Sequence, residues 1–149
     1  MLTIKKILCP VDFSDPSLEG LGISVDLAGR FGASIEAIYV LPILPPQPID
    51  PNYSFQVPEY EILLRQDAEK RLAAILKEKV PEAIASSSVV IQGSAGKEIV
   101  KYAEENKFDL IVIASHGHGG WHHLVMGSVA EKVVRHSPCP VFVVRQPRK

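Results

Sequence analysis

The chain has 149 residues and a formal net charge of −1 at pH 7, a length that fits one domain over residues 1–149. A nearly neutral chain lacks the broad basic field of nucleic-acid-binding proteins, and no segment is apolar over the length that crosses a bilayer. The apolar run of residues 4–9 is too short for the core of a signal peptide. Cys9 and Cys139 lie in apolar, strand-like segments without a CxxC motif, which predicts reduced thiols in a cytoplasmic protein.

The first part of the chain predicts strand, helix and strand. Residues 4–11 form the first strand. Asp15 is expected to cap a helix in which Pro16 takes the first position, and Gly32 suits the left-handed position after the helix end. Residues 35–40, which are mostly β-branched or aromatic, form the second strand.

A proline-rich segment follows. Residues 41–58 contain six of the twelve prolines and should form an extended loop, of the kind that serves as a lid or a partner-binding segment or is disordered. A charged amphipathic helix is expected over residues 59–79. Its inner side should carry Ile62, Leu63, Leu72, Ile75 and Leu76.

The second half alternates in the same way. Strands are predicted at residues 88–92, 109–114 and 140–144, and helices at 98–106 and 129–136. Five strands that alternate with four helices predict a single-domain α/β fold: an open, mainly parallel sheet with right-handed crossovers and helices on both faces.

Ligands of such sheets bind beyond the carboxyl ends of the strands, where the strand order reverses. Asp12 follows the first strand, and a glycine- and histidine-rich loop follows the fourth. Ser128 and Glu131 predict a capping box, hence a helix N-terminus directly after this loop. Such an end attracts anions, and Gly127 leaves room for a close approach. The same pattern also occurs at many helix starts that bind nothing.

The spacing in this loop resembles that of the universal stress protein family. Residues 114–117 (ASHG), nine further residues and then Gly127-Ser128 are similar to the family's nucleotide loop, which is Gly-x-x-Gly, nine residues, Gly-Ser/Thr. The resemblance extends over nearly the whole chain, through ILCPVDFSDPS, GSAGKEIV and MGSVAEKVVRHSPCPVFVV. Ala114 replaces the first glycine of the pattern, and one methyl group adds little steric cost at the end of a strand.

This resemblance implies an adenine nucleotide alpha hydrolase-like sheet of order 3-2-1-4-5 that binds ATP, with Mg²⁺ or Mn²⁺ held mainly by the phosphates. It places Asp12 at the nucleoside end, Val11 and Val40 near the adenine, and Gly117 near the ribose and phosphates. Backbone N–H groups at the start of the last helix would bind the phosphates. The expected nucleotide-binding residues are Pro10, Val11, Asp12, Val40, Ala114, Ser115, His116, Gly117, His118, Gly127, Ser128 and Val129.

The loop histidines His116, His118, His122 and His123 raise the alternative of a metal site. They share one loop with no cysteine or carboxylate between them, whereas zinc ligands usually come from fixed elements. Hydrogen bonding to phosphate, or exposure to water, is the favoured interpretation. No nucleophile–base–orienter set is visible, so no catalytic residue is predicted.

The last strand, with Val141, Phe142, Val143 and Val144, would form an edge of the sheet. An open apolar edge is an aggregation hazard that two-fold pairing removes, and the family resemblance implies a homodimer of this kind. The preferred hypothesis is an ATP-binding, nucleotide-responsive regulator or sensor of the stress response. The alternatives are a nucleotide-free dimeric interaction module and a slow ATPase.

Overall fold

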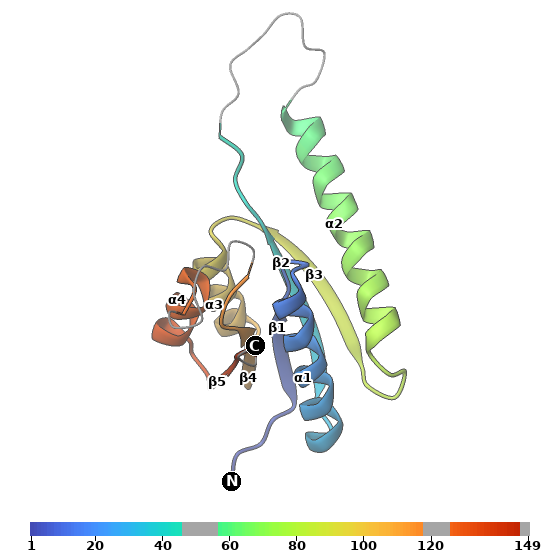
Figure 1. The fold of residues 1–149 in the computed structure, drawn as a ribbon, viewed down its shortest axis with the longest axis vertical. Coiled ribbons are helices and arrows are strands. Elements are labelled where there is room, and N and C mark those ends of the chain that lie inside the picture. Colours follow the sequence, from blue (N-terminus) through green and yellow to red (C-terminus); the bar gives the residue numbers. More distant parts are fainter. Residues whose placement is uncertain (46–56, 118–125, 147–149) are drawn as a thin grey trace, which may run out of the picture.

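The structure is a computed structural model that describes residues 1–45, 57–117 and 126–146. In this part of the chain five strands alternate with four helices (Figure 1). None of the described helices has the length and apolar character needed to cross a bilayer. The elements are β1 (Lys6–Pro10), α1 (Asp15–Phe31), β2 (Ser34–Leu41), α2 (Val57–Lys79), β3 (Ser86–Gln92), α3 (Ala95–Glu105), β4 (Leu110–Ala114), α4 (Ser128–His136) and β5 (Val141–Val144).

The strands form one sheet of order β3-β2-β1-β4-β5, and every neighbouring pair is parallel. The predicted fold class and strand order are therefore confirmed. The order reverses between β1 and β4, which makes this pair the switch point of the sheet. These two strands pair at only two positions, Ile7 with Leu110 and Leu8 with Ile111, whereas β1 and β2 pair at five. The ladder between β1 and β4 thus stops short of their carboxyl ends.

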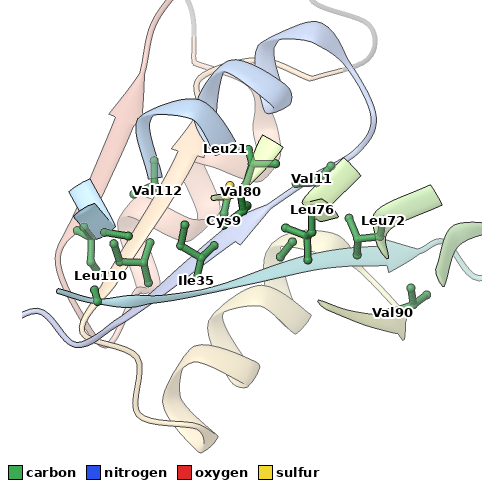
Figure 2. Close-up of a cluster of buried hydrophobic side chains, with 14 of the residues drawn as sticks. Cys9, Val11, Leu21, Ile35, Leu72, Leu76, Val80, Val90, Leu110 and Val112 are labelled. Carbon is green, nitrogen blue, oxygen red and sulfur yellow. The ribbon is translucent and has the colours of Figure 1, made fainter. Parts of the chain in front are cut away.

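Helices cover both faces of the sheet. Leu21 of α1 and Leu72 of α2 pack with Cys9 and Val112 on one face (Figure 2). Ile99 of α3 and the start of α4 pack on the other face. The strand side chains that they contact alternate along the strands with those of the first face. Each strand of the centre is consequently buried on both sides, as the continuous apolar run of β4 predicted.

The start of α1 differs from the sequence prediction. Ser14, not Asp15, is the N-cap: its backbone is extended, and its hydroxyl accepts a hydrogen bond from the N–H of Ser17 at 3.4 Å. Asp15 is exposed in the first turn, where its charge suits the helix dipole. The predicted end is confirmed, because Gly32 has φ 66° and donates its N–H to Ala28.

Helix α2 is only partly packed. Leu72 and Leu76 are buried as predicted, but the prediction for Ile62 and Leu63 is wrong, since each is 55% exposed. The 23 residues of α2 span about 35 Å, whereas the seven residues of β3 span about 23 Å. About the first two turns of α2 therefore extend past the sheet (Figure 1). Most of the proline-rich segment, residues 46–56, lies outside the described residues.

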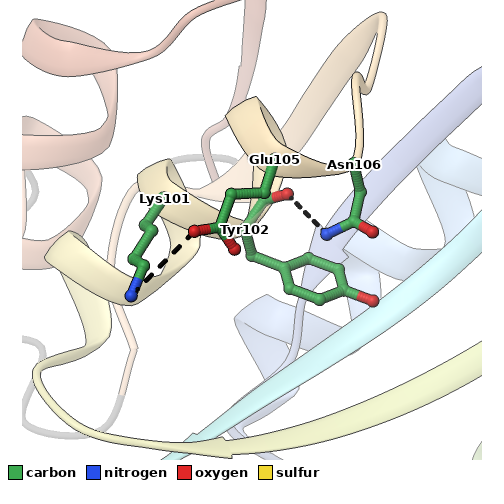
Figure 3. Close-up of polar contacts among 4 residues, drawn as sticks. All are labelled: Lys101, Tyr102, Glu105 and Asn106. Carbon is green, nitrogen blue, oxygen red and sulfur yellow. Dashed lines mark hydrogen bonds and ion pairs between the residues drawn. The ribbon is translucent and has the colours of Figure 1, made fainter.

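Helix α3 begins three residues earlier than predicted, at Ala95, and polar contacts hold its end (Figure 3). Asn106 is the C-cap, and its side-chain amide donates to the carbonyl of Tyr102 at 3.0 Å. Lys101 and Glu105 lie 4.0 Å apart as an exposed ion pair. The Tyr102 hydroxyl donates to Glu36 of β2, and burial together with this carboxylate raises the pKa of Tyr102 to about 12. The bond from Tyr102 to Glu36 therefore links α3 to β2.

Candidate functional site

A cavity of about 320 Å³ lies at the carboxyl ends of β1 and β4, where the ladder between these strands has stopped. This is the position at which doubly wound sheets bind ligands, and the volume is within the usual range for small-molecule sites. Of the residues predicted to bind nucleotide, His118 lies outside the described residues. All the others line the cavity: Pro10, Val11, Asp12, Val40, Ala114, Ser115, His116, Gly117, Gly127, Ser128 and Val129.

A hydrogen-bond network fixes the side chain of Asp12. Its Oδ1 accepts the backbone N–H of Ser14 at 3.0 Å and also the Ser14 hydroxyl. The N–H of Asp12 donates to the Ser17 hydroxyl at 3.3 Å, and Ser17 in turn donates to the Ser14 carbonyl at 2.9 Å. The N-cap of α1 therefore orients the carboxylate of Asp12 as well as starting the helix.

Two glycines allow the chain to close around the cavity. A Cβ at Gly117 would lie 2.1 Å from Oδ2 of Asp12, so a side chain there would displace this carboxylate. Gly127 donates its N–H to the carbonyl of Ser115 at 2.7 Å, and a Cβ at Gly127 would lie 3.0 Å from the same oxygen. Hence both motif glycines are needed for close packing inside the protein, before any ligand is considered.

The predicted capping box at the start of α4 is wrong. Gly127, with φ −61° and ψ 156°, is the N-cap, and Ser128 is the first helical residue. Glu131 pairs with Arg135 at 2.8 Å instead of reaching back to the helix start. Because a glycine cap has no side-chain acceptor, the first N–H groups of α4 have no partner on their own cap residue. Ser128 and Val129 are exposed and line the cavity, so the positive end of the helix dipole faces it.

His116 adds a polar atom to this wall. Its Nδ1 lies 3.1 Å from the Ser115 hydroxyl, and its Nε2 is buried with no hydrogen-bond partner among the described residues. Within that part of the chain, no group of three or more histidine, cysteine or acidic residues could hold a metal ion. His118, His122 and His123 lie outside the described residues. His116 thus offers one hydrogen bond to a bound molecule.

The two cysteines are not candidates for catalysis. Cys9 is fully buried in the core, and burial raises the pKa of its thiol to about 12. Burial also raises the pKa of Cys139, which lies beside Ser137 in the turn before β5. The thiolate is the nucleophilic form, so a raised pKa makes both thiols poor nucleophiles, and both residues pack with the hydrophobic clusters.

The sequence prediction missed part of the wall. Tyr39 and Ile38 of β2, Ala95 and Ile99 of α3, and Met126 reach the cavity from its sides. The residues of β2 and α3 could have been predicted from the topology, because β2 ends at the same edge of the sheet and α3 begins there. Residues Ser17, Ile113 and Ala130 also line the cavity.

The fold and the site together define a doubly wound α/β protein with a cavity at its switch point. The model of the universal stress protein family matches residues 3–145. Universal stress protein MJ0531 of Methanocaldococcus jannaschii is 34% identical over 145 residues, which make up 97% of this chain and 84% of that protein. The chain therefore belongs to the universal stress protein family.

Solved structures agree with this assignment. That of protein MJ0577 of Methanocaldococcus jannaschii has a TM-score of 0.79 and 26% identity and covers 99% of both chains. The universal stress protein of Archaeoglobus fulgidus in complex with dAMP has a TM-score of 0.64 and 18% identity, and the match covers 97% of this chain and all of that one. The second likeness supports the fold alone.

Proposed function

We propose that this protein binds ATP in the cavity between β1 and β4 and acts as a nucleotide-responsive regulator in the stress response. The observation that carries the proposal is the start of α4, where Gly127 exposes helix N–H groups to the cavity opposite the oriented carboxylate of Asp12. The N–H groups at the start of α4 suit an anion, and the carboxylate of Asp12 suits a hydrogen-bond donor. A nucleotide carries an anion at its phosphate end and hydrogen-bond donors at its nucleoside end. A protein of the same fold, the universal stress protein of Archaeoglobus fulgidus, is in complex with dAMP, which is an adenine nucleotide.

The described residues fit an adenine nucleotide. Val11 and Val40 supply an apolar surface for the base, and Asp12 accepts hydrogen bonds from the nucleoside. The N–H groups of Ser128 and Val129 face the phosphates, and Nε2 of His116 gains a partner. A divalent cation, Mg²⁺ or Mn²⁺, would be held by the phosphates and would lower their charge repulsion.

Calorimetry with ATP tests the proposal. Gly127→Val should abolish binding, because its side chain would press on Ser115 and cover the start of α4. Gly29→Val is the matched control, since a Cβ at Gly29 meets no atom within 4 Å. In thermal unfolding, ATP at a hundred times its dissociation constant should stabilise the wild type by about 2.7 kcal/mol. Unchanged affinity in Gly127→Val, or no binding by the wild type, would reject the proposal and favour a nucleotide-free interaction module.

The edge of the sheet supports the accompanying proposal of a homodimer. In the described part of the chain, β5 has a strand neighbour only in β4, and Phe142 is 44% exposed on it. Pairing of β5 with its copy would cover Val141, Phe142, Val143 and Val144. Sedimentation should give a dimer for the wild type and a monomer for Phe142→Glu. Ile62→Glu, at an exposed apolar residue of α2, is the control and should stay dimeric.

A further inference from the structure

Phe13 has a backbone conformation that aromatic residues rarely adopt. Its φ is 66°, in the left-handed region, and it connects Asp12, which lines the cavity, to Ser14, which caps α1. Phe13 is not one of the lining residues but packs against the core between the sheet and helices α1 and α2. The left-handed turn therefore directs two consecutive side chains apart, the carboxylate into the cavity and the ring away from it.

The Phe13 ring contacts groups on two other elements. Its centroid lies 4.9 Å from that of Tyr39 in β2, with the rings tilted by 47°. The guanidinium carbon of Arg71 in α2 lies 4.1 Å from the same centroid, which is a cation–π geometry. Tyr39 lines the cavity, whereas no described residue of α2 does. Arg71 therefore does not line the cavity itself, and the Phe13 ring connects it to the segment that carries Asp12.

We propose that Phe13 and Arg71 are positioning residues that hold the carboxylate of Asp12 in its binding orientation. The two ring contacts keep Phe13 in its left-handed turn, and this turn sets the direction of the preceding carboxylate. Helix α2 is thereby linked to the nucleotide site, so that displacement of Arg71 weakens nucleotide binding. By linkage, bound nucleotide strengthens the contact between α2 and Phe13 to the same extent. The inference rests on the proposed ATP site.

The experiment compares ATP affinities by calorimetry for the wild type, Arg71→Met, Arg71→Lys and Lys70→Met. Arg71→Met keeps the aliphatic stem but removes the cation, and it should weaken binding about two- to fivefold, the range of an exposed cation–π contact. Arg71→Lys keeps the charge and should restore part of the affinity. Lys70→Met removes a neighbouring exposed charge of α2 and should bind as the wild type does.

A double-mutant cycle separates positioning from general loss of structure. In the Asp12→Ala background, Arg71→Met should have no further effect on ATP affinity, because the group it positions is absent. Urea unfolding without nucleotide checks that each variant is folded. The inference is overturned if Arg71→Met binds as the wild type does, or if it weakens binding equally with Asp12 and with Ala at that position. Failure of the wild type to bind ATP would instead reject the proposed function itself.

Discussion

Replacing Ser14 should cost far more stability than replacing Asp15, although the two are neighbours at the start of α1. Ser14 is only 7% exposed, and its hydroxyl both accepts from the N–H of Ser17 and donates to the carboxylate of Asp12. At 3.4 Å the first bond is long, so the cap contributes about 0.5–1 kcal/mol. The bond to a charged group contributes about 1.5–3 kcal/mol. Ser14→Ala should therefore lower the free energy of unfolding by about 2–4 kcal/mol.

Urea unfolding without nucleotide, followed by circular dichroism, measures this difference. Asp15→Ala removes an exposed charge in the first turn, and its effect should stay within about 1 kcal/mol. In thermal unfolding, Ser14→Ala should lower the midpoint by about 4–16 °C. Equal losses in the two variants would show that the hydroxyl of Ser14 does not hold the loop between β1 and α1.

Three further results are expected. Leu72→Ala should lower the free energy of unfolding by about 2–5 kcal/mol, because Leu72 is fully buried. Leu63→Ala should change it by about 0.5 kcal/mol or less, because Leu63 is exposed. Equal effects would contradict the packing of α2. The Cys9 thiol has a pKa of about 12 in the folded protein and near 9 in the unfolded chain. The free energy of unfolding should therefore fall between pH 9 and 12, as the unfolded chain loses this proton first. Between pH 8 and 10, urea unfolding should show a larger fall for the wild type than for Cys9→Ala. Gly117→Ala should reduce ATP affinity, because the added methyl group would meet the carboxylate of Asp12. Gly29→Ala should not, because its methyl group meets no atom within 4 Å. Equal ATP affinities of the two variants in calorimetry would contradict this reasoning.

Much of the fold follows from patterns that the backbone itself requires. The apolar run of β4 is buried on both faces because helices cover both sides of a parallel sheet. Gly32 ends α1 because only a residue without a Cβ takes its left-handed position at no cost. The gathering of Asp12 with residues 114–117 and 126–128 follows from topology, since parallel strands end at one edge of the sheet. The strand order itself was inferred from family resemblance and not from the residue pattern.

The errors concern features that depend on geometry over short distances. Ser14 and Asp15 are both good cap residues, and the choice between them depends on backbone angles that no local pattern determines. Ser128 has the composition of a cap but lies one residue inside α4, because Gly127 is already held by Ser115. The exposure of Leu63 depends on the relative lengths of α2 and β3, which periodicity does not encode.

The double role of Gly127 calls for a variant that tests the start of α4 without disturbing the chain closure. Val129 is 37% exposed in the first turn of α4 and lines the cavity, whereas Val134 is 43% exposed near the other end of the helix. Val129→Glu places a negative charge where the triphosphate is proposed to bind, and a carboxylate in a first turn also stabilises the helix.

ATP affinity of Val129→Glu should therefore fall by about tenfold or more at low salt, without loss of stability, and the deficit should shrink as salt screens the repulsion. Val134→Glu should bind ATP as the wild type does. Calorimetry at two ionic strengths measures both effects. A deficit that is the same at both would attribute the loss to steric obstruction, and undiminished affinity would place the phosphates away from α4.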